Sequence, residues 1–447
     1  MKFKNSFNLK RKMVFAVLTL FLFASLCVNL SRVQGSPQVE QAGPVVIHVQ
    51  SLAAGGMADA LAGGIAKFNE EYSGRIKAEV IGVPYAVAYE KIMADFTAGA
   101  ETYDVIAFSE QWVGSMARYF TSLDDLIKND PDLDFDDIPS GAWKLAQYKD
   151  VTYGVPIRIG SNILFMRKDL FVEAGLRIPP SDLNEYLEAA KKLTRDTNGD
   201  GSIDIYGTQY SVKDAVTAHG PISFHLFAFG GDWLNESMTE GALSSRDSLQ
   251  AMKFMVDMYN KHKVVPPECI GWSSWVEGVE AAAQGRTAMY NQYSPRVLIV
   301  ENPEQSKTAG KWAYSTMPLK KGMEKQPGVF WAGGWQYAIV KTSDYKEAAW
   351  EYIKFMASYE IQKYMALEFA NGPTRTDVIL DPDFAAGYPA YEALATSLKY
   401  NRTTPPHPRF SEIANIATEE LHAALVGRKS TEDAMRDADR RINEILK

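Results

Sequence analysis

Cysteine and histidine are scarce in this sequence. The 447 residues include two cysteines, Cys27 and Cys269, and six histidines that are scattered along the chain. They form neither a cysteine cluster nor a helical histidine pair with the spacing of metal ligands. If Cys27 leaves with an N-terminal leader, Cys269 is the only thiol and no internal disulfide can form. We therefore expect the burial of apolar side chains to hold the fold together.

Motifs of common enzyme classes are also absent. The sequence contains no Gly-x-Ser-x-Gly nucleophile motif and no glycine-rich loop of the kind that binds phosphate. Its formal net charge of −8 argues against a general nucleic-acid-binding protein, because such proteins neutralise phosphates with many Lys and Arg side chains. We predict a protein that is not an enzyme and has no nucleic-acid partner.

One long apolar run lies near the N-terminus, and no later run is long enough to cross a membrane. The run MVFAVLTLFLFASL follows a basic segment and is shorter than the roughly 20 residues of a spanning helix. The segment Val33-Gln34-Gly35 predicts cleavage after Gly35, so residues 1–35 are read as a signal peptide and 36–44 as a tether. Two alternatives stay open: lipid attachment at Cys27, which Leu26 disfavours, and an uncleaved membrane anchor. The mature protein is predicted in the periplasm or at the extracellular cell surface.

The mature chain is large, and strands alternate with helices at its start. About 410 residues exceed the roughly 250–300 that one core supports, so we expect two or more domains. The β-α-β-α-β order predicts a mainly parallel sheet with helices on its faces. Ligands of such sheets bind outside the carboxyl ends of the strands, which places a site in the loops after Ser51, Val83 and Ser109. The predicted elements are strands Val45–Ser51, Ile76–Val83 and Asp104–Ser109 and helices Gly55–Tyr72 and Tyr89–Thr97.

The later sequence predicts further amphipathic helices and a second stretch of strand. VTYGVPIR reads as a strand, and the AGL that follows KDLF predicts a helix ending at Gly175 in the left-handed conformation. GVFWAGGWQYAIV at Gly328–Val340 reads as a turn and a strand. Apolar periodicity predicts helices over Leu183–Leu193, Ser248–Lys261, Trp275–Gln284, Tyr345–Ser358, Ile361–Phe369, Phe410–Leu425 and Thr431–Leu446.

An acidic loop, DTNGDGSID, has oxygen-bearing side chains at alternate positions. Such alternation places ligands around one point, as in a calcium-binding loop, and Gly201 falls where that loop bends. The twelfth position, normally a bidentate glutamate, is Gly207. Two readings stay open, a structural calcium site and an exposed turn rich in Asp, Asn and Gly. No cofactor is required in either reading. The candidate ligands are Asp196, Asn198, Asp200, Ser202 and Asp204.

Seven short motifs in this order resemble one family. They are LDDL near Leu123, the stretch YGVP…KDLF…AGL…PP, AAAQGRTAM at Ala281–Met289, GGW at Gly333–Trp335, EAAWEYIKFM at Glu347–Met356, GPTR at Gly372–Arg375 and the C-terminal GRKSTEDAMRDADRRINEIL. The chain is thereby identified as similar to the extracellular solute-binding proteins of carbohydrate ABC importers, the cluster that includes maltose- and trehalose/maltose-binding proteins.

The resemblance implies an α/β fold of two lobes, each a mainly parallel sheet flanked by helices, with the ligand cleft between them. The chain crosses between lobes more than once, so each lobe is discontinuous in sequence. We place 45–157 with about 310–357 in the first lobe and 158–309 with about 358–447 in the second. The protein is expected to be a monomer that delivers its ligand to the membrane subunits of the importer.

The resemblance also implies roles for individual residues. The tryptophan of GGW, Trp335, would stack on a sugar ring, and Arg375 in the P-T-R turn would bind hydroxyls. Trp112 would lie near the cleft. The glycine pair would let the ligand approach the backbone. Many relatives have an aspartate where Ser109 stands, so the identity of the sugar does not carry over. The remaining ligand-binding candidates are Gly333, Gly334, Glu110, Ser109, Arg158, Tyr85, Asn291, Tyr293 and Trp331.

The predicted ligand is a sugar or oligosaccharide, because aromatic faces and planar polar groups suit sugar C–H patches and hydroxyls. A polyol or glycerol phosphate is the alternative ligand. The alternative function is a secreted glycoside hydrolase, which needs two carboxylates flanking the scissile bond. Glu110 and Asp232 are the pair to consider, although nothing in the sequence brings them together.

Overall fold

A computed structural model describes residues 43–53, 56–273, 276–326, 328–369 and 371–447. The predicted signal peptide and Cys27 lie outside these residues, as does most of the predicted tether. Among the described residues, no helix combines the length and the apolar character that crossing a membrane requires.

The first five elements follow the predicted order. Strand β1 (Val45–Leu52) pairs in parallel with β2 (Ile76–Val83) and with β3 (Val105–Ser109). Helix α1 (Gly56–Glu71) and helix α2 (Tyr85–Ala98) form the two connections. Helix α2 starts four residues before the predicted helix because Pro84, at its N-cap, is compatible with a helix start. It ends at Gly99, whose φ of 67° is left-handed.

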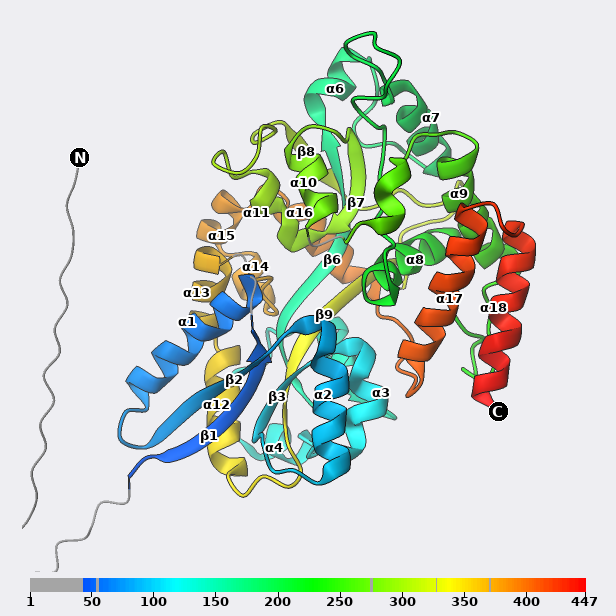
Figure 1. Ribbon diagram of the computed structural model, residues 1–447. Coiled ribbons are helices and arrows are strands. Elements are labelled where there is room, and N and C mark those ends of the chain that lie inside the picture. The colour runs from blue at the N-terminus through cyan, green and yellow to red at the C-terminus, as the bar shows by residue number, and fades with distance from the viewer. Residues whose placement is uncertain (1–42, 54–55, 274–275, 327, 370) are drawn as a thin grey trace, which may run out of the picture. The chain divides into compact units, whose positions relative to one another are not determined.

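Two long buried strands carry the chain from this first sheet region to the rest of the molecule. Strand β9 (Phe330–Ile339) pairs antiparallel with β3 on one side and with β6 (Val155–Arg167) on the other. Strand β6 then pairs antiparallel with β7 (Met289–Tyr293) and β8 (Trp312–Ser315). Figure 1 shows β6 and β9 running side by side between the group around β1–β3 and the group around β7 and β8. The pairing is parallel within β2-β1-β3. It is antiparallel where β9 and β6 pair with each other and with β3, β7 and β8.

The apolar side chains form two clusters, and both include residues of the crossing strands β6 and β9. The first contains the cores of β1–β3, α1 and α12 (Lys346–Ala357). The second contains α7 (Leu183–Leu193), α8 (Ala215–Phe229) and α9 (Arg246–Asn260). The C-terminal helices α17 (Phe410–Leu425) and α18 (Thr431–Leu446) complete the second cluster and have the predicted bounds.

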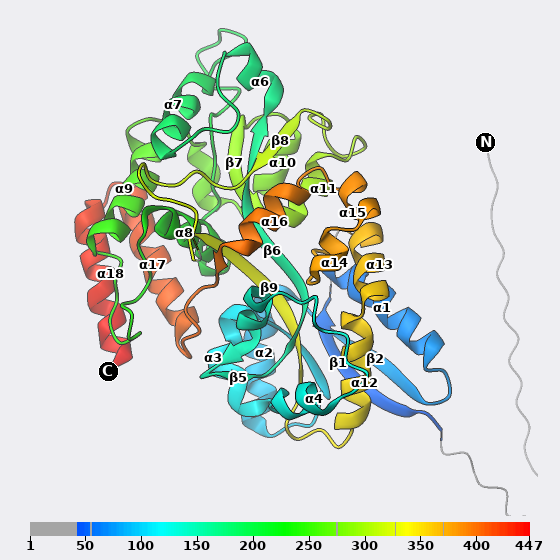
Figure 2. The same cartoon turned by 180° about the vertical axis from the view of Figure 1, so that it is seen from behind.

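Four consecutive helices that were predicted to belong to the second lobe contribute side chains to the first apolar cluster. The sequence prediction assigned about 358–447 to the second lobe. In the structure, apolar residues of the segment 361–398 pack into the first cluster, among them Ile361, Met365 and Leu394. Figure 2 shows the first of these helices beside α1 and α12 and the last beside β6. The helices are α13 (Tyr359–Phe369), α14 (Thr376–Ile379), α15 (Pro382–Gly387) and α16 (Tyr391–Lys399).

Local sequence explains several of the remaining boundaries. Asp182 caps α7 by accepting hydrogen bonds from the backbone N–H of Asn184 and Glu185, and Ser430 caps α18 in the same way. The helix after β6 ends near Gly175, whose φ is 61°. Further elements are α3 (Val113–Met116), α4 (Asp124–Asn129), α5 (Ser140–Trp143), β4 (Gln147–Tyr148), β5 (Val151–Thr152), α6 (Lys168–Glu173), α10 (Glu277–Ala283), α11 (Val297–Val300) and β10 (Asn401–Arg402).

Gly372 brings the loop between α13 and α14 against the crossing strand. Its carbonyl oxygen accepts a hydrogen bond of 3.0 Å from the N–H of Ile159. A Cβ atom at Gly372 would lie 1.9 Å from the carbonyl oxygen of Ile159, which is backbone and cannot move aside alone.

We expect Gly372→Ala to lower the free energy of unfolding by about 1–3 kcal/mol, the usual cost of overpacking. Gly387→Ala is the matched control, because a Cβ atom at Gly387 meets no atom within 4 Å and its φ is not left-handed. Urea denaturation of both variants and the parent protein measures the difference. Equal midpoints for Gly372→Ala and the parent would contradict this account of the contact.

Candidate functional site

The strand register places most of the predicted site residues on one face of the sheet. Trp335 on β9 pairs with Ser109 on β3 and with Arg158 on β6. Because side chains alternate between faces, Gly333 and Gly160 share the face of Trp335 and Arg158. The pairing of Asn162 with Tyr293 extends this face to β7, where Asn291 is two residues from Tyr293. We call this face, from Ser109 to Asn291, the site floor.

Glu110 begins the short 3-10 helix Glu110–Trp112 that follows β3, and its carboxylate is buried above the floor. Its Oε2 atom accepts hydrogen bonds from the N–H of Gly334 at 3.1 Å and from the hydroxyl of Ser109 at 2.9 Å. Burial raises the pKa of Glu110 to about 7, although both of these hydrogen bonds oppose the shift. The loop after β3 therefore carries a buried carboxyl group. It is one of the three loops in which the sequence predicted a ligand site.

The glycine pair is required by the protein's own packing. A Cβ atom at Gly333 would lie 2.7 Å from the Trp331 ring, and one at Gly334 would lie 2.4 Å from the carbonyl oxygen of Arg158. The prediction that these glycines leave room for a ligand at the backbone finds no support here, because Trp331, Glu110 and Arg158 occupy the space.

Three aromatic rings pack together at the end of β3. The ring centroids of Trp112 and Trp335 are 5.4 Å apart and those of Tyr85 and Trp335 are 5.6 Å apart, both in edge-to-face geometry. Trp335 retains 9% exposure. Trp112 and Trp335 thus contact one another, whereas stacking of Trp335 on a sugar stays a prediction.

Helix α8 meets the floor through His219. Its Nε2 atom lies 3.9 Å from Oε1 of Glu110, and its ring packs edge-on against Trp331 at 5.5 Å. Burial lowers the pKa of His219 to about 4, so the imidazole is neutral at physiological pH. Glu110 directly follows β3, whereas His219 lies on α8. Their contact therefore joins the part of the molecule around β1–β3 to the part that contains α8.

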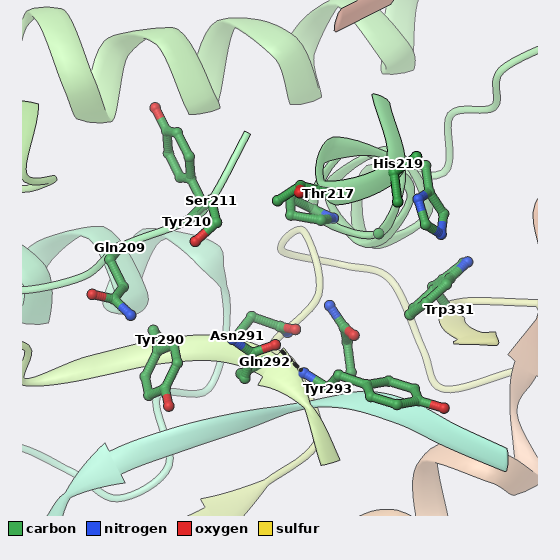
Figure 3. A pocket seen from close by; sticks show the side chains of 14 residues that line it. Gln209, Tyr210, Ser211, Thr217, His219, Tyr290, Asn291, Gln292, Tyr293 and Trp331 are labelled. Atoms are coloured by element: carbon green, nitrogen blue, oxygen red, sulfur yellow. Dashed lines mark hydrogen bonds between the residues drawn. The ribbon is translucent and has the colours of Figure 1, made fainter. Parts of the chain in front are cut away.

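A pocket opens between the β7 end of the floor and the start of α8. The space between its lining atoms, open solvent at the mouth included, is about 460 Å³. Figure 3 shows Thr217 and His219 on one side of it and Asn291, Gln292 and Tyr293 on another. The lining residues are Asn162, Gln209, Tyr210, Ser211, Val216, Thr217, His219, Gly220, Pro221, Tyr290, Asn291, Gln292, Tyr293 and Trp331.

Three lining residues, Asn291, Trp331 and Tyr290, have buried polar atoms without a partner among the described residues. Asn291 is 6% exposed, and neither the oxygen nor the nitrogen of its amide is hydrogen-bonded. The Nε1 atom of Trp331 is also buried and has no hydrogen-bond partner among these residues. Buried polar groups are nearly always hydrogen-bonded, and leaving one unsatisfied costs about 1–3 kcal/mol. All three groups border the same pocket, so a bound molecule with hydroxyl groups would satisfy them.

Arg375 lies away from this pocket. Its Nε and Nη2 atoms donate to the carboxylate of Asp377, and Nη2 also lies 3.1 Å from Oδ2 of Asp134. Its Nη1 atom donates to the carbonyl oxygen of Asp134. The guanidinium group is thus bound by the protein itself, because the turn at Gly372 directs it toward the segment before α5. The structure does not bring Arg375 together with the other predicted ligand-binding residues.

The acidic loop is ordered by hydrogen bonds within itself. The carboxylate of Asp196 accepts from the backbone N–H of Asn198, Gly199 and Gly201, and that of Asp204 accepts from Thr197. The N–H of Gly207, at the twelfth position, donates to Thr194, and its backbone packs against Ala190. In the part of the chain that the structure describes, no group of three His, Cys, Asp or Glu side chains has the geometry to hold a metal ion. The calcium hypothesis therefore still rests on residue spacing.

A family model of the bacterial extracellular solute-binding proteins matches residues 54–363. This chain belongs to that family. Its fold is the two-lobed α/β fold of the family, since solved structures superimpose over nearly the whole described chain. The maltose-bound MalE3 of T. maritima has a TM-score of 0.79 at 24% identity and covers 90% of this chain and 100% of its own. A ribitol complex from Agrobacterium radiobacter has a TM-score of 0.78 at 27% identity, with coverage of 90% and 98%.

Two curated relatives extend the comparison to sequence. This solute-binding protein is 26% identical to a mannitol-binding protein of Pseudomonas aeruginosa over 308 residues, which are 64% of this chain and 67% of the relative. It is 22% identical to a galactooligosaccharide-binding protein of Bacillus subtilis over 384 residues, 84% of this chain and 83% of the relative.

Sequence reasoning missed the α8 side of the pocket. No helix was predicted over Ala215–Phe229, whereas the structure forms α8 there, with Pro221 inside the helix. Thr217 and His219 therefore went unnoticed, as did Gln209 on the preceding segment. The one available signal was Asp214, three residues before Thr217, because Asp is a strong N-cap residue and here accepts from the N–H of Thr217.

The raised pKa of Glu110 predicts a pH-dependent stability. A carboxyl group whose folded pKa lies above its unfolded value stabilises the fold fully below pH 4.5 and loses that contribution as the pH rises through about 7. Glu110→Gln removes this dependence and leaves His219 in place. We expect the variant to gain stability relative to the parent between pH 5 and pH 8, by up to about 3 kcal/mol. The free energy of unfolding of both proteins is measured in urea over this pH range. An equal pH dependence in the variant and the parent would contradict the raised pKa of Glu110.

The hydrogen bonds within the acidic loop predict that calcium does not change the melting temperature of the protein. Its carboxylates already accept backbone N–H groups, so we expect the melting temperature after EDTA treatment to stay unchanged when Ca²⁺ is added. Asp196→Asn should then lower the melting temperature equally with and without Ca²⁺, because it weakens the charge-assisted bonds to three N–H groups. A Ca²⁺-dependent rise that Asp196→Asn abolishes would instead establish the metal site.

Proposed function

We propose that this protein binds a small carbohydrate or polyol in the pocket between β7 and α8 and delivers it to the membrane subunits of an ABC importer. The unpartnered amide of Asn291 is the observation that carries the proposal, because a ligand hydroxyl can both donate to and accept from an amide. The names of two relatives support the class of ligand, since one is a mannitol-binding protein and the other a galactooligosaccharide-binding protein.

The polar character of the pocket supports the same class of ligand. Three side-chain amides in addition to Asn291, those of Asn162, Gln209 and Gln292, line it together with Ser211 and Thr217. Amides and hydroxyls match the alternating donors and acceptors of a polyhydroxylated molecule. The ring of Trp331 adds an apolar wall that can lie against C–H groups.

A binding protein without catalytic activity accounts for the carboxylates better than a hydrolase does. Asp232, the suggested partner of Glu110, forms an ion pair with Arg402 at 2.7 Å and does not line the pocket. Glu110 is held by Gly334 and Ser109. The proposal therefore includes no hydrolysis, and incubation with oligosaccharides should release no reducing ends.

Closure of the two lobes on the ligand completes the proposed cycle. Ligand contacts made with both lobes favour the closed form, because only differential affinity shifts a conformational equilibrium. In this structure, the contact of Glu110 with His219 lies at such a junction. The closed form is what the membrane subunits would recognise. We also propose export to the periplasm or cell surface and action as a monomer.

Asn291→Leu tests the proposal. A thermal-shift screen of sugars and polyols first identifies a ligand, since a molecule that binds the folded state raises the melting temperature. We expect Asn291→Leu to weaken binding of that ligand about tenfold or more, as loss of hydrogen bonds in a buried site does. Isothermal titration calorimetry measures the affinity.

The ligand-free variant should keep its melting temperature, because the replaced amide has no partner among the described residues. Asn184→Leu, at an exposed position on α7, is the control and should bind like the parent. Unchanged affinity of Asn291→Leu would place the ligand elsewhere, and release of reducing ends by the parent would overturn the binding-protein proposal.

A further inference from the structure

The buried arginine of the site floor has no partner to match its charge. Arg158 is 8% exposed, and its Nε atom has no hydrogen-bond acceptor among the described residues. Its guanidinium group lies 5.7 Å from the centre of the Tyr293 ring, and none of the ion pairs of the described residues includes it. By comparison, Arg375 is 1% exposed and forms ion pairs with three carboxylates, those of Asp134, Asp137 and Asp377. Arg158 is therefore not explained by the folded chain alone.

The position of Arg158 connects it to the proposed pocket. Arg158, Gly160 and Asn162 follow one another on the same face of β6, and Asn162 lines the pocket. Tyr293 lies over Gly160, since a Cβ atom there would be 2.4 Å from the Tyr293 ring. Tyr293 thus lines the pocket and also lies beside Arg158. Arg158 is two residues before Gly160 on β6, where it pairs with Trp335.

The surrounding charges leave this region positive. Arg296 is a second arginine close by, and its pKa is lowered to about 10, first by burial and then by the charge on Arg158. The carboxyl group of Glu110 is hydrogen-bonded to Gly334 and Ser109, and not to Arg158. His219 is neutral, and Asp214 is exposed and caps α8. Burying a cation without an anion is costly, because the interior cannot replace its hydration.

We propose that the ligand is a carbohydrate or polyol with an acidic group, a carboxylate or a phosphate, and that Arg158 binds this group. The inference rests on the proposed function and specifies the ligand. Two oxygen atoms of a carboxylate or phosphate fit the planar N–H fork of a guanidinium group and also neutralise its charge. Neutral hydroxyl groups would satisfy the hydrogen bonds and leave the charge uncompensated.

Matched ligands of different charge test the proposal on the purified protein. Each set contains a neutral hexose or hexitol, its uronic or aldonic acid and its phosphate ester. We expect an acidic member to bind about tenfold or more tightly than its neutral parent, the increment typical of a charge-assisted contact. The acid and phosphate arms distinguish the two possible groups. Calorimetry gives the affinities, and thermal shift screens the sets.

Arg158→Gln is the decisive variant, and the acid-to-neutral affinity ratio is its readout. We expect the ratio to fall to about one, because the variant loses the charge contact with the acidic member in addition to the hydrogen bonds that both members can form. Arg286→Gln is the control, because Arg286 is an exposed arginine paired with Glu268 away from the floor, and it should leave the ratio unchanged. In the absence of ligand, Arg158→Met should not lower the melting temperature, since it removes a buried charge that has no partner.

Each contrary outcome has a distinct meaning. If the neutral members bind at least as tightly as the acidic ones, or if Arg158→Gln weakens both equally, the acidic ligand is wrong and carbohydrate binding stands. If Arg158→Met lowers the ligand-free melting temperature, Arg158 has a structural role and the proposal fails. If no member of any set binds, both this inference and the proposed function fail.

Discussion

The antiparallel register of β3, β9 and β6 is the constraint on which the site depends. It places Ser109, Trp335 and Arg158 side by side on one face, and the continuation into β7 adds Tyr293 and Asn291. A slip of one residue would turn all of these side chains to the opposite face, because successive side chains alternate. Gly334 secures the register locally, since its N–H is bound by Glu110 and any side chain there would meet the carbonyl oxygen of Arg158.

The floor combines groups that the folded chain satisfies with groups that it leaves unsatisfied. Glu110 and Arg375 have partners within the protein, whereas the amide of Asn291, Nε1 of Trp331 and Nε of Arg158 have none among the described residues. Binding of a ligand to these three groups would compensate for their cost. The unsatisfied groups follow one another along the floor, which favours a single elongated polar ligand over several unrelated sites.

Much of the fold follows from local pattern. The bounds of α7, α17 and α18 were predicted from apolar periodicity, and the parallel β1–β3 unit from the order of strands and helices. The start of the crossing strand β6, Val155–Arg158, was also predicted, as was the family, whereas Val151–Thr152 forms the separate strand β5. The site was predicted less well. Arg375 was placed at the ligand by analogy, yet nearby carboxylates bind it, and the sequence gave no sign of where the guanidinium group of a turn residue would point.

The sequence by itself determined the family, the order of strands and helices and the pool of polar and aromatic candidates, because these depend on periodicity and short motifs. The tertiary structure decided which of them meet. Ser109, Arg158 and Asn291 are far apart in the chain and come together only through strand pairing, and His219 reaches Glu110 only through the packing of α8. Burial, which turns an ordinary arginine or asparagine into an unsatisfied group, is likewise a property of the assembled fold and not of any local segment.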